Sequence, residues 1–177
     1  MSHPTGAPDP GAAAGHWTLD PARSSVRFHS KTFWGILTVK GEFGSVSGEG
    51  DVLPDGTAHG TLTVLAASLD TGNAKRDTHL RSADFFDIEQ HTALVFTART
   101  VGAPVDGTVQ VAGDLAVRGV TRPLTFPARV TAAGPQDVTL EAEVAIDRGD
   151  FGITWNQLGM LKDPSTIAVT AAFRHQG

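Results

Sequence analysis

The sequence predicts an all-β domain, an antiparallel barrel of eight or more strands with one short helix inserted. Three observations predict it: apolar and polar residues alternate over most of the chain, short turn signals separate the alternating runs, and one segment, residues 73–82, breaks the period of two. Such alternation is typical of strands with one buried and one wet face. Short turns imply antiparallel neighbours, and closure into a barrel removes exposed edges. A two-sheet sandwich has the same period and is the alternative.

The first sixteen residues, 1–16, are rich in Pro, Gly and Ala. They lack the basic start and the continuous apolar core of a secretory signal. We therefore expect a flexible N-terminal tail, a folded domain over residues 17–177 and a cytoplasmic location.

Apolar residues then alternate with polar ones in run after run. The runs that we expect to form strands cover residues 26–29, 37–43, 61–66, 94–99, 109–117, 124–130, 138–147 and 167–173. The turn signals between them are Pro54-Asp55-Gly56, Asp106-Gly107, Arg118-Gly119 and Gly134-Pro135. Several runs reach about ten residues, longer than the usual strand of about five or six, which favours a deep barrel over a sandwich.

Residues 73–82 are the one segment with helical character. Asn73 is a suitable N-cap, and the residues after it include neither Gly nor Pro. Asp77 and Arg81 are four apart, close enough to pair on a helix face. A helix this short, with so little apolar surface, is stable only when it docks on the sheet. We expect Arg76, Asp77 and Arg81 to bind neighbouring loops or each other.

Composition and charge exclude several classes of function. The chain of 177 residues is 40% apolar and 19% charged, which fits one globular domain. A net charge of -5 argues against a nucleic-acid partner that needs a basic surface, and no apolar stretch reaches the length of a membrane span. Without cysteine there is neither a disulfide nor a thiolate site.

No pattern in the sequence predicts a catalytic residue, a metal site or a cofactor. The seven histidines are scattered and form none of the close pairs of metal sites. The carboxylates lie beside arginines or turns, where ion pairs and caps explain them, and neither a nucleophile elbow nor a phosphate-binding loop is present.

A series of motifs resembles the YceI-like family from Trp17 to about Phe173. The motifs are Trp17-Thr18-Leu19-Asp20, Ser24-Ser25-Val26-Arg27-Phe28, Val39-Lys40-Gly41-Glu42-Phe43, Ser68-Leu69-Asp70-Thr71-Gly72, residues 76–82, Asp84-Phe85-Phe86-Asp87, Gly113-Asp114-Leu115, residues 118–123 and residues 146–153. In one departure, Thr32 follows Lys31 where the family commonly has a histidine. The resemblance implies an eight-stranded antiparallel, lipocalin-like barrel whose apolar interior holds a polyisoprenoid or another long-chain amphiphile, with no family catalytic site to carry over.

Ten residues are candidates for ligand binding in such a barrel. Phe28 and Phe96 are on apolar strand faces and would form the wall. Candidates for the mouth are Phe33, Trp34, Trp155, Leu158 and Met160. From the residues alone, these aromatic and aliphatic side chains are equally well explained as a cap on the core. The cations Lys31, Arg76 and Arg81 would meet an anionic head group, or else belong to surface ion pairs.

The function that we expect is non-catalytic binding, storage or transport of an isoprenoid or other long-chain lipid, by a protein without a nucleic-acid partner or a membrane span. A homodimer is the assembly that we consider. Two alternatives are open: an enzyme acting on an isoprenoid lipid, and a structural or stress protein with a filled barrel. An eight-stranded barrel can be filled by side chains or hold one ligand, so the cavity volume separates the last alternative from the first reading.

Overall fold

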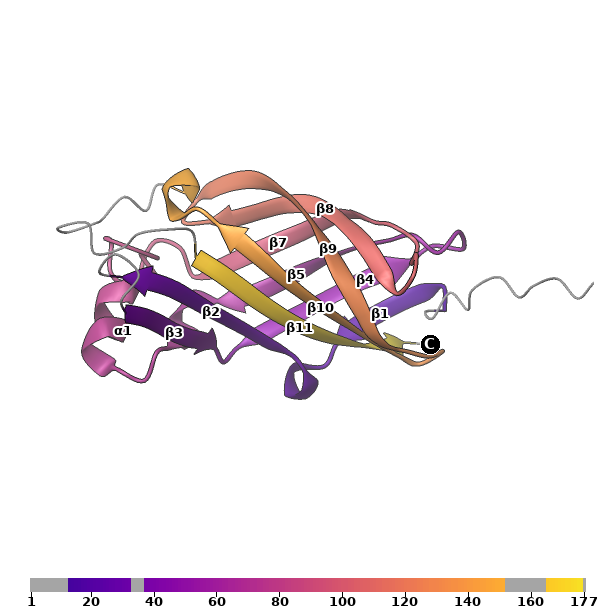
Figure 1. Ribbon diagram of the computed structural model, residues 1–177, viewed down its shortest axis with the longest axis horizontal. Coiled ribbons are helices and arrows are strands. Elements are labelled where there is room, and N and C mark those ends of the chain that lie inside the picture. Colours follow the sequence, from indigo (N-terminus) through magenta and orange to yellow (C-terminus); the bar gives the residue numbers. More distant parts are fainter. Residues whose placement is uncertain (1–12, 33–36, 152–164, 177) are drawn as a thin grey trace, which may run out of the picture.

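The computed structural model describes residues 13–32, 37–151 and 165–176, which form one antiparallel sheet of eleven strands, one α-helix and three 3₁₀ turns (Figure 1). In chain order the elements are β1 (Gly15–Leu19), η1 (Pro21–Arg23), β2 (Ser25–Thr32), β3 (Leu37–Phe43), β4 (Val46–Val52), β5 (Ala58–Leu65), η3 (Ala66–Ser68), β6 (Leu69–Asp70), α1 (Ala74–Arg81), β7 (Ala93–Val101), β8 (Thr108–Val117), β9 (Val120–Ala133), β10 (Asp137–Ile146), η4 (Arg148–Phe151) and β11 (Ser165–Gln176).

The sheet closes into a barrel because β1 pairs with two neighbours. On one side it pairs with β4, and on the other it pairs with the end of β11, from Leu19 opposite Phe173 to His16 opposite Gln176. The closed ring therefore runs β1-β4-β5-β7-β8-β9-β10-β11 and back to β1, eight strands in all. The expected eight-stranded antiparallel barrel with one helix is confirmed, and the closed ring excludes the open two-sheet sandwich.

Three strands of the barrel are interrupted at the same level. The turn η1 separates β1 from β2, Gly44 and Ser45 separate β3 from β4, and η3 separates β5 from β6. The breaks lie side by side, because Gly44 donates its N–H to the carbonyl of Ser68 and Leu65 donates its N–H to the carbonyl of Ser45. Beyond the breaks, β2, β3 and β6 extend the sheet from β11 toward the end of the barrel that α1 covers (Figure 1).

Two hairpin turns have the geometry that the sequence predicts. Asp106-Gly107 and Arg118-Gly119 all have positive φ, at 52° and 75° in the first turn and 53° and 73° in the second. Positive φ at both central residues is the type I′ geometry, whose twist matches that of the flanking strands. These turns join β7 to β8 and β8 to β9 and so fix the register of the ring.

The helix α1 begins and ends as the sequence predicts. The side chain of Asn73 accepts the N–H of Arg76 at 3.0 Å, and the helix ends before Ser82. Asp77, which is 6% exposed, does not reach along the helix but back to Thr71, accepting its backbone N–H at 3.0 Å and its hydroxyl. Because α1 has little apolar surface of its own, polar contacts to the preceding loop hold the helix in place.

The cations of α1 contact the same loop. Arg76 donates to the hydroxyl and the carbonyl of Thr71, both at 2.8 Å. Arg81 donates to the carbonyl of Leu69 at 2.8 Å and to that of Ala67 at 3.3 Å. The expectation that Arg76, Asp77 and Arg81 bind neighbouring loops is confirmed.

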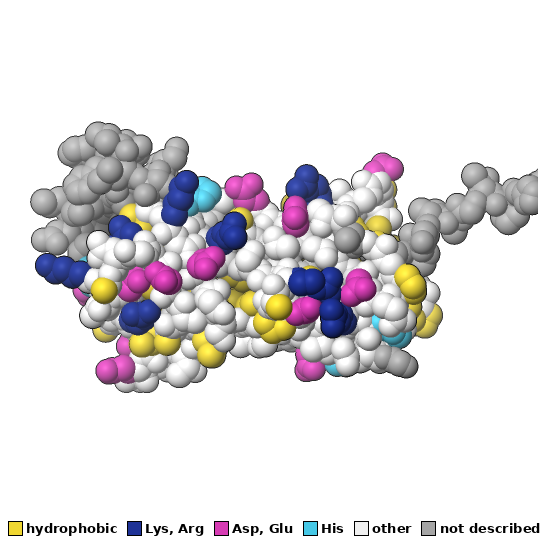
Figure 2. Space-filling view, turned by 90° about the horizontal axis from the view of Figure 1, so that it is seen from below, with side chains coloured by type: hydrophobic (Ala, Val, Ile, Leu, Met, Phe, Trp, Pro, Cys, Tyr) yellow, Lys and Arg dark blue, Asp and Glu magenta, His cyan; other side chains and the backbone are white. Residues whose placement is uncertain are grey.

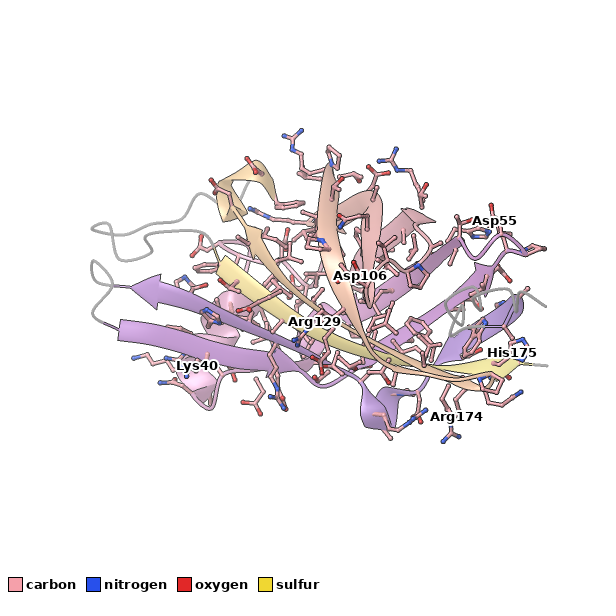
Figure 3. All side chains as sticks on the ribbon, turned by 45° about the vertical axis from the view of Figure 1, so that its right-hand side comes forward. Lys40, Asp55, Asp106, Arg129, Arg174 and His175 are labelled. Carbon is pink, nitrogen blue, oxygen red and sulfur yellow. The ribbon has the colours of Figure 1, made fainter. Side chains whose placement is uncertain are left out.

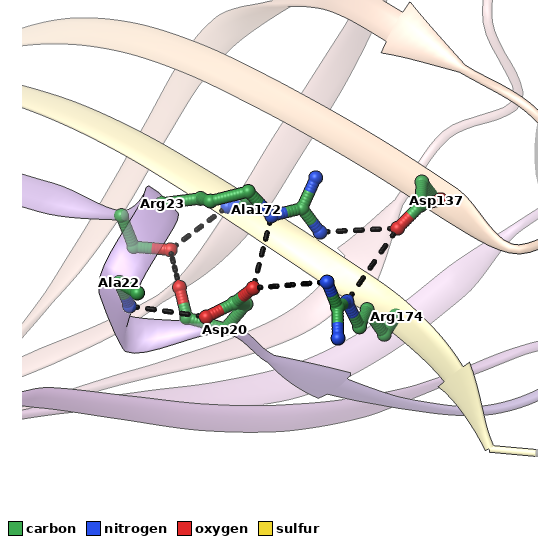
Figure 4. A network of polar contacts seen from close by, with 7 residues as sticks. Asp20, Ala22, Arg23, Asp137, Ala172 and Arg174 are labelled. Atoms are coloured by element: carbon green, nitrogen blue, oxygen red, sulfur yellow. Dashed lines mark hydrogen bonds and ion pairs between the residues drawn. The ribbon is translucent and has the colours of Figure 1, made fainter.

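Four charged residues join η1 to β10 and β11 (Figure 4). Asp20 accepts from Arg23 at 2.9 Å and lies 3.7 Å from Arg174, while Asp137 accepts from Arg23 at 3.0 Å. The hydrogen bond from Arg23 lowers the pKa of the Asp20 carboxyl below its ordinary value, and the N–H of Ala22 and the charge of Arg174 act in the same direction.

The described N-terminal residues take part in the barrel. The strand β1 begins at Gly15, inside the range expected for the tail, and the Nδ1 atom of His16 lies 3.0 Å from the Asp51 carboxylate, which accepts the hydrogen bond. The indole N–H of Trp17 donates to the carbonyl of Ala13 at 2.9 Å. Residues 1–12 lie outside the described residues.

The outer face of the barrel carries the polar residues of the alternation. Figure 2 shows positive and negative side chains interspersed over one face, with smaller apolar areas between them. Arg174 and His175 lie at the end of the barrel away from α1, whereas Lys40 lies on the α1 side (Figure 3). Of the helices that the described residues form, none combines the length and the apolar character needed to cross a bilayer.

Candidate functional site

The interior of the barrel encloses a cavity of about 680 Å³. This volume falls within the range of about 300–1,000 Å³ that is usual for small-molecule sites. The cavity extends along the barrel, because its wall includes Phe86 and Phe151 near α1 as well as Trp17 and Pro104 near the other end. Alternate residues of the ring strands form the wall, as the period of two requires.

Stacked layers of hydrocarbon side chains make up one side of the wall. Along β11, the inward residues that follow Ser165 are Ile167, Val169, Ala171 and Phe173. Pairing across the sheet places Val144 beside Ile167, and Ile167 beside Phe28. Each such layer comes from three or more strands, so the apolar wall is continuous around this side of the cavity.

Aromatic rings concentrate toward the α1 end. Phe43 lies between Phe28 and Phe86, with ring centroids 5.4 Å and 5.8 Å away. Phe86 is held in the short segment after α1, where its N–H donates to the carbonyl of Leu80 at 3.0 Å. A separate pair, Phe96 and Phe126, has centroids 5.5 Å apart. Contacts of this kind stabilise a wall beyond the area that they bury.

Glycines on two adjacent strands leave room for the cavity. On β4 and β5, Gly50 and Gly60 are cross-strand partners, and both line the cavity. A Cβ atom on Gly60 would lie 2.5 Å from the carbonyl oxygen of Glu49, so only glycine fits there. The inner surface is thus bare backbone at this point.

Two of the charged residues that border the cavity belong to the outer face of the barrel. Glu49 and Asp51 flank Gly50 on β4, and their side chains are 70% and 48% exposed. Both contact His16 on the outside of the barrel, at 3.5 Å and 3.0 Å. Among the residues that the structure describes, no group of three or more His, Asp or Glu is placed to hold a metal ion.

One acid–base pair lies near the α1 end. The Nε2 atom of His79 lies 2.9 Å from the carboxylate of Asp84, and the His79 ring meets Phe85 edge to face with centroids 5.2 Å apart. The two polar side chains are 39% and 52% exposed. Neither is among the residues that line the cavity.

The structure places the residues proposed from the sequence in three groups. Phe28 and Phe96 line the cavity, and both rings pack on a second phenylalanine. Arg76 and Arg81 lie away from the lining residues and contact the loop before α1, while Lys31 lies in β2. The mouth candidates lie outside the described residues: Phe33, Trp34, Trp155, Leu158 and Met160.

Sequence reasoning did not single out several lining residues. Phe43 and Phe126 follow the strand alternation and could have been chosen on the same ground as Phe28. No strand period covers Phe86, and its place in the wall depends on how α1 docks. The inward glycines carry no periodic signal either, since a residue without a side chain fits both faces of a strand.

A family model described as the YceI-like domain matches residues 17–173. Among curated proteins, UPF0312 protein SAS2572 of Staphylococcus aureus strain MSSA476 is 31% identical over 150 residues, which span 80% of this chain and 84% of that protein. UPF0312 protein SAUSA300_2620 of strain USA300 matches with the same identity and the same coverage.

Solved structures share the fold at lower identity. BcnA of Burkholderia cenocepacia superposes with a TM-score of 0.78 at 21% identity, covering 87% of this chain and 98% of that one. A polyisoprenoid binding domain from Saccharophagus degradans, implicated in plant cell wall breakdown, has a TM-score of 0.71 at 16% identity, covering 90% and 98%. With the family model spanning nearly the whole described barrel, the chain belongs to the YceI-like domain family.

Proposed function

We propose that this protein holds a polyisoprenoid or another long-chain amphiphile inside its barrel, for storage or transport and without chemistry. The cavity of about 680 Å³ with its hydrocarbon wall is the observation that carries the proposal. An apolar wall favours a ligand whose bulk is hydrocarbon, because burial of apolar surface is the main source of affinity there. The structural neighbour from Saccharophagus degradans, a polyisoprenoid binding domain, supports the same ligand class.

The energetics allow such binding without a charged contact. Each buried methylene contributes about 0.8 kcal/mol, so a chain of about twenty carbons gains on the order of 16 kcal/mol. Loss of translational and rotational freedom offsets about 4–15 kcal/mol of this gain. Chain length is therefore the main determinant of affinity in this proposal.

The two alternatives differ in what they require of the barrel. A structural protein with a filled barrel conflicts with the size of the cavity. An enzyme would need titratable groups that converge on the ligand. Two described His–Asp pairs resemble an acid–base dyad. His79–Asp84 lies outside the cavity lining, and His16–Asp51 lies at the rim, where its side chains are 44% and 48% exposed.

Titration with a fluorescent isoprenoid probe tests the proposal. Wild-type protein is expected to bind the probe, and Phe96→Glu to abolish binding while the barrel stays folded, because the carboxylate would have to be buried against hydrocarbon. Phe96→Leu keeps the wall apolar and should bind within a few-fold of wild type. Thr100→Glu adds the same charge to an exposed position of β7 and controls for net charge.

Failure of the wild-type protein to take up any isoprenoid or fatty-acyl probe would refute the carrier function. Native mass spectrometry of freshly purified protein, followed by organic extraction, identifies the ligand that the proposal requires. The cytoplasmic location and the homodimer stay predictions from the sequence, to be checked by cell fractionation and by light scattering after size-exclusion chromatography.

A further inference from the structure

Two serine hydroxyls meet in the barrel wall at the α1 end. The Oγ atoms of Ser30 on β2 and Ser165 on β11 are 2.6 Å apart, and Ser165 lines the cavity. Both residues continue the inward alternation of their strands, Ser30 after Val26 and Phe28, and Ser165 before Ile167. The pair is therefore a polar site at one end of an apolar wall.

The described cross-strand neighbours of the pair on the inner face are hydrocarbon. Ile146 is the cross-strand partner of Ser165 on β10, and Phe28 pairs with Ile167 in the next layer of the wall. At the far end of the cavity, the lining residues Glu49, His59 and Asp106 are exposed to solvent, and the indole N–H of Trp17 already donates to the carbonyl of Ala13. The two ends of the cavity wall thus differ in the hydrogen bonds that they offer to a ligand.

The hydroxyl pair has hydrogen-bonding capacity beyond its own contact. Each serine hydroxyl has one O–H donor and two acceptor lone pairs. When one hydroxyl donates to the other, the accepting hydroxyl can still donate its own O–H to a ligand, and lone pairs remain on both oxygens. A polar group in an apolar wall is costly unless it is hydrogen-bonded, so a ligand oxygen at this point would be stabilised by the pair.

We propose that the Ser30–Ser165 pair binds an uncharged oxygen, a hydroxyl or a carbonyl, in the head group of the bound amphiphile. This inference rests on the proposed carrier function and adds an orientation to it. The head lies at the α1 end, and the apolar tail extends along β11 toward Phe173 and Trp17.

The geometry and the charge of the site both fit this ligand. From Ser165 to Phe173 the strand rises about 26 Å at about 3.3 Å per residue, and a strand tilt of about 40° reduces the depth along the barrel axis to about 20 Å. An anionic head would have to be buried against Ile146, Ile167 and Phe28, which penalises charge strongly. An alcohol or a carbonyl needs only the hydrogen bonds that two hydroxyls supply.

A matched pair of ligands tests the inference on the full-length protein. Phytanol and phytane have the same branched C20 skeleton and differ in one terminal hydroxyl. Each competes with the fluorescent isoprenoid probe for wild type, for Ser30→Ala/Ser165→Ala and for Ser47→Ala, which removes a hydroxyl from an exposed position of β4. Phytanyl phosphate is added as the anionic form of the head.

We expect the double variant to lose affinity for one ligand and not for the other. The double variant should bind phytanol about fivefold more weakly, the effect of one net hydrogen bond, and bind phytane as wild type does. Ser47→Ala should change neither affinity. Wild type should bind phytanol in preference to phytanyl phosphate.

Other outcomes separate this inference from the carrier function. Equal losses for phytanol and phytane would mean that the serines serve the wall alone, and the inference would be wrong while the carrier function stands. Tighter binding of phytanyl phosphate than of phytanol, unchanged in the double variant, would place the head group elsewhere and also overturn it. If none of these ligands displaces the probe and the probe itself does not bind, the carrier function fails first.

Discussion

The substitution Asp77→Ala tests how α1 is held on the barrel. Its carboxylate is 6% exposed and accepts both the backbone N–H and the hydroxyl of Thr71. Hydrogen bonds to a charged group contribute about 1.5–3 kcal/mol each, and the variant leaves the N–H of Thr71 without this acceptor. Because the two bonds share one carboxylate, we expect a total loss of about 3 kcal/mol rather than the sum of the upper values.

A loss of this size is easily measured. For a domain of this length it lowers the Tm by about 6–12 °C, at about 2–4 °C per kcal/mol. The assay is reversible urea unfolding, followed by circular dichroism and by tryptophan fluorescence, with thermal unfolding as a second measurement. Thr71→Val keeps the backbone N–H bond to Asp77 but removes the hydroxyl, which donates to Asp77 and accepts from Arg76, and should cost about 1–2 kcal/mol.

Two comparisons make the result decisive. Lys75→Ala changes an exposed residue of the same helix and should stay within about 0.5 kcal/mol of wild type. The double variant of Asp77 and Thr71 should lose less than the sum of the single losses, because the two residues share one contact. A free energy of unfolding unchanged in Asp77→Ala would refute the view that polar contacts hold α1 in place.

Two further predictions concern Asp20 beside η1 and the strand β1. The pKa of Asp20 is lower in the folded state than in the unfolded state. Its contribution to stability is therefore present above the unfolded-state pKa of about 4 and is lost as the pH falls through the folded-state pKa. Asp20→Asn should flatten the fall in the free energy of unfolding on acidification, and a variant with the same pH dependence as wild type would contradict this. Deletion of residues 1–11 should leave the unfolding curve and the lipid content unchanged. Deletion of residues 1–16 should lower stability, because it removes the start of β1 and the Ala13 carbonyl that accepts the indole N–H of Trp17. Equal unfolding curves for the two deletions would show that the start of β1 does not stabilise the barrel.

Local signals account for the parts of the fold that were predicted. The alternation over residues 109–117 and 124–130 coincides with β8 and β9, and Asp106-Gly107 and Arg118-Gly119 form the turns that the residue types favour. Asn73 caps α1 because capping requires only the residue itself and the three that follow it. Each of these features is encoded within a few neighbouring positions.

The remaining features depend on residues far apart in the sequence. The breaks at Gly44, Ser45 and η3 lie side by side only because β4 pairs with β5 and β3 pairs with β6. Ser30 and Ser165 are 135 positions apart and meet only through the pairing of β2 with β11. The interior volume is likewise a sum over many strands, so periodicity alone left a filled and a hollow barrel equally open.

The closing pair of strands also constrains how this chain reaches its folded state. Because β1 joins β11, residues at the beginning and at the end of the chain must meet before the ring exists. During synthesis the other ring strands emerge before β11, so the apolar face of the sheet stays uncovered until β11 has left the ribosome. Contacts this distant in sequence form slowly, and exposed apolar strands are prone to aggregation in the meantime. A chain that lacks β11 would therefore have no closed interior, and its half-formed sheet would be a natural substrate for chaperones.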